Sequence, residues 1–595
     1  MPNMKNKKEI INRQILREII ATFKWNYQYT KRYSGRIVLC LLLGLIATGL
    51  SLVSSVAFKF VIDSVVGKNL SGVRTAFAAT ILLSLCNIPI NSLSSRISLR
   101  VNIRITNSMI ADAFQAILNT RWEDISVYQT GDLLNRLHSD VRTVSGIVVS
   151  TLNSVLLSSA MMFGAFAVIV YYDPTFAFLS LLSAPFLGII YKLMMKRIHA
   201  FSMETKKIDS ELMSFNAESL KNIQILKAFA IEPFRVYNLR RVQSRYEKVN
   251  MDFNKISLIV SAFMGVLGMF TNYACYAWGI YRLWTGGITF GTMTLFLQLS
   301  SIFRSSFSSI TGIVPGLVSA STSTSRIMEV MRLNRDEQPD VESSRKTTEN
   351  CLRYGAEIAF ENVEVKYKNS DAIVENVHML FDRNDTVALI GSSGSGKTTI
   401  FRALLGLIRP SGGKICVRIK ADGSREIPVS EHTRSLFAYV PQGNTVFSGT
   451  IADNLRTVKP DASDPEIVDA LKAACAYDFV AEMENGINTY VGENGIGISE
   501  GQAQRIAIAR AIICGKPIIL FDEATSSLDI ETERNILQNV KNTKGNRICI
   551  FSTHRFGVLE ICDKVYHVAD HSIRPLTLAE ARKICTETQN RPGED

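Results

Sequence analysis

Six long apolar stretches in the first half of the chain constrain its fold more than any other feature. Each is roughly 20 residues or longer, which is enough for an α-helix to cross the hydrocarbon core of a bilayer. Within lipid, a spanning segment of this kind must satisfy its backbone hydrogen bonds internally, so it forms a helix. Pro89, Pro185 and Asn272 interrupt some stretches, which membrane helices tolerate inside a bundle. We therefore expect a membrane α-helical bundle with six transmembrane helices, at residues 37–62, 75–93, 147–172, 175–195, 256–284 and 290–318.

The distribution of basic residues predicts the orientation of these helices. The first 36 residues contain nine Lys and Arg against two Glu. Three short segments are expected on the non-cytosolic side of the membrane. The first holds only Lys68, Arg74 and Asp63 as charged residues, the second holds only Asp173, and the third holds none. Because cytosolic segments are enriched in Lys and Arg, we expect a cytosolic N-terminus. The cleavage pattern of a signal peptide is lacking, so the first apolar stretch should remain as a membrane anchor.

The basic character of the chain points to lipid rather than to nucleic acid. The net charge of +12 follows from the same bias and favours contact with anionic lipid. No module that combines basic and aromatic residues for nucleic-acid recognition is found in the sequence, so we expect no nucleic-acid partner. Before the first span, Ile11, Ile15, Ile19 and Phe23 form an apolar stripe. The stripe predicts a helix on the inner membrane surface, with a helix docked on protein as the alternative.

A glycine-rich sequence in the second half, GSSGSGKT, has the form G-x-x-x-x-G-K-[ST]. A strand-like run at 387–390 precedes it and a helical pattern at 399–408 follows, which is the context of a phosphate-binding loop. Glycines let the backbone wrap a phosphate chain, Lys397 would reach the β- and γ-phosphates, and Thr398 would hold Mg²⁺. The predicted ligand is Mg-ATP, and a Gly/Ser-rich turn is the alternative. The loop consists of Gly391, Ser392, Ser393, Gly394, Ser395, Gly396, Lys397 and Thr398.

Two acidic residues about a hundred residues downstream fit the same chemistry. The apolar run at 518–521 predicts a buried parallel strand, and it ends in Asp522 and Glu523. Asp522 would bind Mg²⁺ through a water, and Glu523 would polarise the attacking water. Between the two motifs, Ser499 and Gln502 form an S-x-x-Q capping box that predicts a helix start. This helix start is an expected anion site, with an ordinary N-cap as the alternative.

These motifs together resemble the ATP-binding cassette proteins. Seven elements occur in the order typical of that family: Tyr367, the phosphate loop with the following Thr399, Gln442 in YVPQGNTVFSGTIADN, Ser499, Gly501 and Gln502 in ISEGQ, the pair Asp522 and Glu523, Ser527-Leu528-Asp529, and His554. One position departs from the family pattern, because Glu500 replaces the first glycine of the usual LSGGQ. A carboxylate at this helix start is expected to weaken closure on ATP.

The resemblance implies a role for each matching residue. Tyr367 would stack on adenine, and Gln442 would join Thr398 and Asp522 around Mg²⁺. Glu523, His554 and Gln442 would catalyse hydrolysis. The signature residues Ser499, Gly501 and Gln502 would contact ATP held by a second nucleotide domain, and Asp529 is likewise expected at the ATP site.

The resemblance also implies a domain order. We expect a bundle of the type I exporter kind, followed by a cytosolic α/β P-loop nucleotide-binding domain. Residues 122–141 and 218–232 resemble exporter cytoplasmic loops, and residues 320–331 resemble the exporter junction into the nucleotide domain. The expected boundaries are 1–332 for the transmembrane domain with its interfacial helix, 333–354 for a polar linker, 355–588 for the ATP-binding cassette domain and 589–595 for a C-terminal tail.

A chain with one nucleotide domain must pair with another to form a complete site. Because Glu523 and His554 are both intact, a homodimer is the simpler expectation, and a related half-transporter is the alternative partner. The expected function is ATP-driven export from the cytosol or inner leaflet by alternating access, in a bacterial plasma membrane. The cargo could be an anionic small molecule, a peptide or a lipid. A lipid or lipid-linked glycan flippase and an ATP-gated channel are the alternative functions.

The sixth apolar stretch contains polar residues that suggest a cargo site. Gln298, Ser301 and Arg304 break an otherwise apolar helix. An arginine at this depth costs at least about 2.5 kcal/mol, so it should face a partner or a watery cavity. We expect these residues to line the transport path and to favour cargo with a carboxylate or phosphate. The alternative is a buried arginine tied to helix carbonyls or neighbouring side chains.

Overall fold

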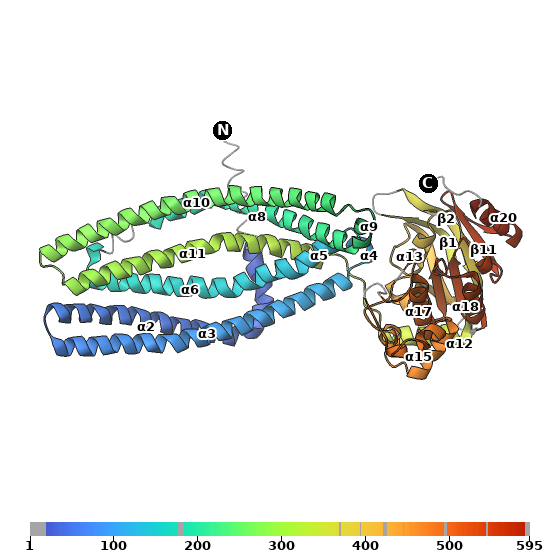
Figure 1. Ribbon diagram of the computed structural model, residues 1–595, viewed down its shortest axis with the longest axis horizontal. Helices are drawn as coiled ribbons and strands as arrows, with labels where there is room; N and C mark the ends of the chain where they lie inside the picture. Colours follow the sequence, from blue (N-terminus) through green and yellow to red (C-terminus); the bar gives the residue numbers. More distant parts are fainter. Residues whose placement is uncertain are drawn as a thin grey trace, which may run out of the picture. The chain divides into compact units, whose positions relative to one another are not determined.

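The computed structural model describes residues 19–176, 184–367, 371–392, 394–420, 425–443, 445–492, 497–542 and 546–589 (Figure 1). The chain divides into two compact units. The first holds the described residues up to Thr120 and from Ser126 to Leu333. The second holds Arg121–Ile125 and the described residues from Asn334 onward. A short piece of the first half of the sequence therefore belongs to the second unit.

The first unit is built from long helices, as the apolar stretches predict. Each of the six predicted spans falls in a helix, except that residues 177–183 of the fourth lie outside the described part of the chain. By length and composition, three described segments qualify as membrane spans, at 19–66, 70–118 and 153–172. The elements are η1 (Lys31–Tyr33), α2 (Ser34–Val66), α3 (Leu70–Leu118), α5 (Thr130–Asn135), η2 (Arg136–Asp140), α6 (Val141–Tyr172), α8 (Ala184–Lys221), α9 (Ile223–Ala228), α10 (Glu232–Trp284) and α11 (Phe290–Met331).

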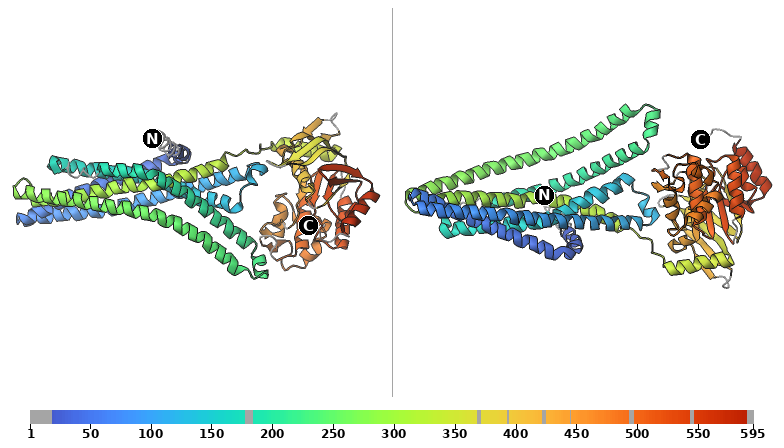
Figure 2. Two further views of the ribbon diagram at one scale, coloured as in Figure 1. Left: turned by 90° about the horizontal axis from the view of Figure 1, so that it is seen from above. Right: turned by 60° about the horizontal axis from the view of Figure 1, so that its bottom comes forward.

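Several of these helices are much longer than a bilayer is thick. Helix α3 has 49 residues and α10 has 53. At 1.5 Å per residue they reach about 74 and 80 Å, compared with a hydrocarbon core of about 30 Å. These helices therefore extend well beyond the length that a bilayer requires. Figure 2 shows α8 and α10 diverging from the other helices toward the end where α9 joins them.

Helix α6 packs against α11 in the apolar centre of the first unit. Phe176 stacks on Phe296 of α11 with ring centroids 4.5 Å apart, and Ile169 and Leu299 are fully buried beside them. At the other end of the unit, the buried carboxylate of Asp140 pairs with cations from α8 and α11. The unit therefore combines an apolar centre with a polar, ion-paired base.

The helix before the first span packs against protein in its described part. Trp25 and Tyr29 lie edge to face with centroids 5.3 Å apart, and they pack on the cluster that contains Val101 and Ile105 of α3. Tyr27 faces outward and is 62% exposed. In the predicted apolar stripe, Ile11 and Ile15 lie outside the described residues, whereas Ile19 packs on the cluster of Ile198 and Val318. The contacts of Trp25 and Tyr29 match the alternative of a helix docked on protein.

The second unit contains a six-stranded sheet and a four-stranded sheet. The order of the larger is β12-β11-β3-β10-β9-β6, in which only β12 is antiparallel to its neighbour. The smaller sheet is antiparallel, in the order β2-β1-β4-β5. The strands are β1 (Ala356–Lys366), β2 (Ala372–Phe381), β3 (Thr386–Ile390), β4 (Gly412–Ile419), β5 (Arg425–Pro428), β6 (Phe437–Val440), β7 (Gly449–Thr450), β8 (Tyr490–Val491), β9 (Ile518–Asp522), β10 (Ile548–Ser552), β11 (Lys564–Ala569) and β12 (Ser572–Leu576).

The buried strands at the centre of the larger sheet are apolar on both faces, as parallel strands require. In β9, Ile519 and Phe521 enter one hydrophobic cluster, and Ile518 and Leu520 enter the other. The predicted strands at 387–390 and 518–521 are confirmed as β3 and β9. The helices of this unit are α4 (Trp122–Ile125), α12 (Val341–Tyr354), α13 (Lys397–Leu404), η3 (Glu431–Leu436), α14 (Ile451–Arg456), α15 (Asp464–Ala473), α16 (Tyr477–Ala481), η4 (Gly486–Asn488), α17 (Glu500–Ile513), α18 (Ile530–Asn542), α19 (Phe556–Leu559) and α20 (Leu578–Gln589).

The predicted linker at 333–354 differs from the structure, because its second part is the helix α12. Asp340 caps this helix by accepting hydrogen bonds from the backbone N–H groups of Glu342 and Ser343. The more buried face of α12 carries mostly small or polar residues, among them Thr348 and the fully buried Cys351. Since Leu352 is the one large apolar residue on this partly buried face, hydrophobic periodicity could not identify the helix.

Candidate functional site

The predicted phosphate loop connects β3 to α13. The side chain of Lys397 is buried, and its Nζ donates to the carbonyl oxygens of Gly391 at 2.7 Å and Ser392 at 2.9 Å. Thr398 and Thr399 follow in the first turn of α13. Ser393 lies outside the described residues. The lysine therefore lies within the loop that would surround a phosphate chain.

Local geometry fits this loop to an anion. Gly396 has φ +106°, and a Cβ there would lie 2.8 Å from Ile373 Cγ2, so only glycine suits the position. The hydroxyl of Ser395 is buried, and no hydrogen-bond partner is found for it among the described residues. A buried hydroxyl of this kind requires a partner, and a phosphate oxygen would supply one. Gly394 also has positive φ, at +77°.

Asp522 ends β9 beside the start of α13. Its Oδ1 accepts from Thr398 Oγ1 at 3.3 Å, and its Oδ2 accepts from the hydroxyl of Tyr439 at 3.1 Å. Burial raises the pKa of Asp522, and the two hydrogen bonds oppose this shift. Burial also raises the pKa of Tyr439, with a further contribution from Asp522, so the phenol remains a donor. A hard oxygen pair from Thr398 and Asp522 suits Mg²⁺.

Glu523 follows the strand with its carboxylate held from several sides. Gln442 Nε2 donates to Glu523 Oε2 at 2.6 Å, and His554 Nε2 lies 3.5 Å from Oε1. Lys397 Nζ lies 4.0 Å from the same Oε1. The backbone of Glu523 has φ +48°, which is uncommon for a residue with a side chain and is found at functional sites. This set can accept a proton and orient a water molecule.

The charges of this site influence one another. Burial lowers the pKa of Lys397, and the nearby Glu523 and Asp522 oppose that shift. Burial also lowers the pKa of His554, and Lys397 at 3.1 Å lowers it further. The nearby Glu523 carboxylate opposes this shift, and the lowered pKa of His554 favours the neutral imidazole, which can act as a hydrogen-bond partner.

The predicted adenine residue, Tyr367, follows β1 at the edge of the site. Its hydroxyl accepts from Arg402 Nη1 at 2.6 Å and lies 3.4 Å from Thr399 Oγ1. Trp122 of α4 lies near the same residues, with the Arg402 guanidinium 4.7 Å from its ring centroid. Tyr367 is therefore held beside the phosphate loop with part of its ring accessible.

The signature residues form the expected helix start. Ser499 accepts from the backbone N–H of Gln502, and Gln502 Oε1 accepts from the backbone N–H of Ser499, so the predicted capping box is confirmed. A Cβ at Gly501 would lie 3.0 Å from the Ser527 carbonyl oxygen. Asp529 caps the next helix, α18, by accepting from the Thr532 N–H.

The signature and the phosphate loop stay apart within one chain. Among the described residues, no hydrogen bond or ion pair joins Ser499, Gly501 or Gln502 to the loop. Ser499 and Glu500 are exposed at the start of α17. The structure therefore brings Lys397, Asp522, Glu523, Gln442 and His554 together, but it leaves the signature available for another nucleotide.

The predicted cargo residues lie together on α11. Gln298, Ser301 and Arg304 are all exposed, at spacings of three residues along the helix. Arg304 Nη1 donates to the Gly268 carbonyl of α10 at 3.4 Å. This hydrogen bond matches the alternative prediction of an arginine tied to a helix carbonyl. Arg304 is exposed, however, whereas that alternative predicts a buried side chain.

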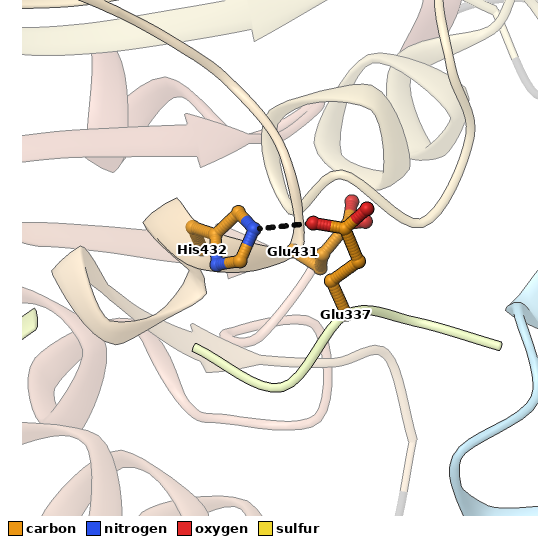
Figure 3. Close-up of side chains that lie close together, drawn as sticks. All are labelled: Glu337, Glu431 and His432. Atoms are coloured by element: carbon orange, nitrogen blue, oxygen red, sulfur yellow. Dashed lines mark hydrogen bonds and ion pairs between the residues drawn. The ribbon is translucent and has the colours of Figure 1, made fainter. Parts of the chain in front are cut away.

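Glu337, Glu431 and His432 place possible metal ligands within 4.8 Å of one another (Figure 3). His432 Nε2 lies 3.2 Å from Glu337 Oε2, and Glu431 pairs with Arg409 at 3.1 Å. These side chains already satisfy one another, and the Arg409 cation disfavours a metal ion. We interpret the cluster as an anchor of the segment after Leu333 onto η3.

Sequence reasoning missed three residues that surround the candidate ATP site: Tyr439, Arg402 and Trp122. The position of Tyr439 near the end of β6 could have indicated its role, since β6 is parallel to β9 and their carboxyl ends share one edge of the sheet. Arg402 follows Thr398 by one helical turn and contacts Tyr367. A polar residue at that position is typical of an exposed helix surface, so the sequence did not indicate this contact. No local pattern places Trp122 beside residues far along the chain.

Comparisons with known proteins match residues in both halves of the chain. Residues 37–307 match the family described as the ABC transporter transmembrane region, and residues 374–526 match the ABC transporter family. An uncharacterized ABC transporter ATP-binding protein of Sinorhizobium fredii is 29% identical over 463 residues, 76% of each chain. An ATP-dependent lipid A-core flippase of Colwellia psychrerythraea is 26% identical over 485 residues, 78% of each chain.

A solved structure shares the whole architecture. A bacterial Atm1-family ABC exporter with ATP bound superposes with a TM-score of 0.81 at 18% identity, covering 95% of this chain and 99% of that one. At this identity the likeness supports the fold, a helical transmembrane domain followed by a nucleotide-binding domain. The chain belongs to the ABC transporter family, with the transmembrane region and the ATP-binding domain fused in one polypeptide.

Proposed function

We propose that this protein is an ATP-driven exporter that works as a dimer with two composite ATP sites. The observation that carries the proposal is the separation of its two half-sites. Lys397 and Glu523 lie together at the carboxyl edge of the sheet, whereas the capped start of α17 at Ser499 is exposed and has no contact with them among the described residues. A second nucleotide domain would place its own capped helix start against the phosphates, where the helix dipole favours an anion.

The chain's own side chains divide the work of hydrolysis. Lys397 would exchange its contacts with the loop carbonyls for the phosphates, and Tyr367 would stack on the base. Thr398, Asp522 and Gln442 would hold Mg²⁺, which supplies charge neutralisation at the phosphates when bound. Glu523 would take the proton of the attacking water, with Gln442 and His554 holding its carboxylate in place.

The cargo path would run along the exposed polar face of α11. Gln298, Ser301 and Arg304 supply a cation and hydrogen-bonding groups at membrane depth, which suits an anionic cargo. The chain would carry its N-terminus and nucleotide-binding domain in the cytosol of a bacterial cell. A phospholipid-like cargo is the second candidate, because a phosphate would satisfy Arg304 and because one relative of this chain is a lipid A-core flippase.

Mixed dimers would test the composite sites directly. Lys397→Ala removes the phosphate contact and Ser499→Ala removes the capping hydroxyl, so each variant alone should lose ATPase activity. Mixed in one membrane, the two chains would assemble one site with both lesions and one site with neither. We expect the mixture to recover ATP-dependent closure, measured by crosslinking, and part of the hydrolysis.

Two controls make the outcome decisive. A dimer in which both chains carry Lys397→Ala has no intact site, so it should recover neither ATP-dependent closure nor hydrolysis. A protein that stays monomeric in membranes with ATP would contradict the proposal, as would full ATPase activity of Ser499→Ala alone.

A further inference from the structure

Three arginines from two segments surround a cavity of about 420 Å³ in the transmembrane unit. Arg32 lies in η1, Arg36 in the first turn of α2, and Arg104 in α3. Tyr33 and Gly35 complete the lining. All three arginine side chains are exposed, so the guanidinium groups can reach a ligand.

No carboxylate neutralises these arginines within the described residues. None of the three forms an ion pair there with Asp or Glu. The sequence explains this, because residues 19–62 and 64–111 contain no acidic residue. Three cations brought together without counter-charge repel one another, so the cavity favours an anion.

The cavity lies where the apolar part of α2 begins. Ile37 and Tyr33 pack on the cluster of Val101 and Ile105 from α3, so Arg104 is level with the first turn of α2. From Arg104, α3 continues to Leu118, close in sequence to Arg121–Ile125 of the nucleotide-binding unit. The cavity is therefore on the side of the apolar spans from which the chain reaches the nucleotide-binding unit.

Exposed apolar side chains adjoin the cavity on its membrane side. Val38, Leu39 and Leu42 of α2 are 51%, 46% and 52% exposed, and Leu99 and Ile103 of α3 are 61% and 50% exposed. A soluble anion would use the arginines but not this apolar surface. A phospholipid would use both, because its acyl chains cover apolar side chains while its phosphate meets the cations.

We propose that this cavity binds the phosphate headgroup of an anionic phospholipid in the cytosolic leaflet. Guanidinium groups pair with phosphate oxygens through two parallel hydrogen bonds, and the volume lies within the range of small-molecule sites. Basic pockets beside transmembrane helices at the cytosolic surface recognise such headgroups. The proposal rests on the cytosolic placement of the nucleotide-binding unit given above.

The test is lipid retention by the full-length dimer. Protein would be purified in mixed micelles containing equal amounts of phosphatidylglycerol and phosphatidylcholine, and bound lipid would be counted by native mass spectrometry. We expect the wild type to retain phosphatidylglycerol preferentially. Each of Arg32→Gln, Arg36→Gln and Arg104→Gln should lower that preference about fivefold.

A matched control is Arg74→Gln, an exposed arginine at the opposite end of α3, which should leave the preference unchanged. Lysine at the three positions keeps the charge and should keep most of the preference, which separates charge loss from misfolding. Equal retention by the triple glutamine variant would overturn the proposal, and displacement of the lipid by 10 mM inorganic phosphate would overturn its assignment to lipid. ATPase activity measured on the same samples distinguishes failure of this site from failure of the exporter mechanism.

Discussion

Replacing Glu523 by Gln tests which group activates the attacking water. The substitution keeps the size of the side chain and the backbone at φ +48°, but it removes the basic oxygen. The contact with Gln442 at 2.6 Å can persist, because an amide oxygen still accepts a hydrogen bond. The change therefore affects the proton acceptor more than the shape of the site.

The expected magnitude follows from comparing the two effects. A general base contributes about two to four decades to the rate, equivalent to about 2.7 to 5.4 kcal/mol. Weakening one neutral hydrogen bond contributes only about 0.5 to 1.5 kcal/mol. We therefore expect kcat to fall by about two to four decades while ATP affinity stays within about a factor of three.

The assays are phosphate release under saturating ATP and equilibrium binding of a fluorescent ATP analogue. Glu531→Gln makes the same chemical change on the exposed surface of α18 and should leave both values unaltered. Near-wild-type hydrolysis by the Glu523→Gln variant would refute the reasoning. His554 at 3.5 Å from Glu523 would then be the next candidate base.

Three further substitutions test separate parts of the site. Tyr439→Phe removes the hydroxyl that donates to Asp522 at 3.1 Å, so kcat/KM should fall about tenfold to a hundredfold. A titration with Mg²⁺ at fixed ATP should show whether the loss is in metal binding. Arg304→Gln should keep basal ATPase activity but lose stimulation by an anionic cargo, and unchanged transport of that cargo in vesicles would assign Arg304 a packing role. Glu500→Gln removes the carboxylate at the start of α17. Half-maximal dimer closure should then need about twofold to fivefold less ATP in a crosslinking titration. An unchanged midpoint of that titration would show that this charge does not oppose ATP binding.

The local structures that carry the candidate ATP site could be predicted from sequence because each part depends on neighbouring residues. A strand followed by a glycine turn and a helix start fixes the surroundings of Lys397, whatever the rest of the fold does. A buried strand ending in Asp522 and Glu523 is equally local. Parallel pairing of β3, β10 and β9 then brings these ends to one edge of the sheet, which the apolar runs already imply.

Features that depend on contacts between distant segments could not be predicted in this way. Trp122 belongs with Arg402 only because residues 121–125 join the nucleotide-binding unit. The partly buried face of helix α12 is mostly polar, as the sequence of a linker would be. Cys351 is fully buried only because other segments pack around it. In the transmembrane unit, hydropathy predicts long apolar helices, but it does not indicate which face of α11 is exposed.

The distribution of the ATP machinery within the chain has a physical consequence for regulation. Lys397, Asp522 and Glu523 are positioned by one sheet, so under the proposed function a single chain would bind ATP without a partner. Ser499 lies on a separate helix, and in the proposed dimer its capped start would complete a site only when a second domain approaches. Under the proposed function, binding and hydrolysis would depend on different contacts, and hydrolysis would wait for closure of the dimer. Since Glu500 places a negative charge at that closing contact, this chain should require more ATP for closure than it requires for binding.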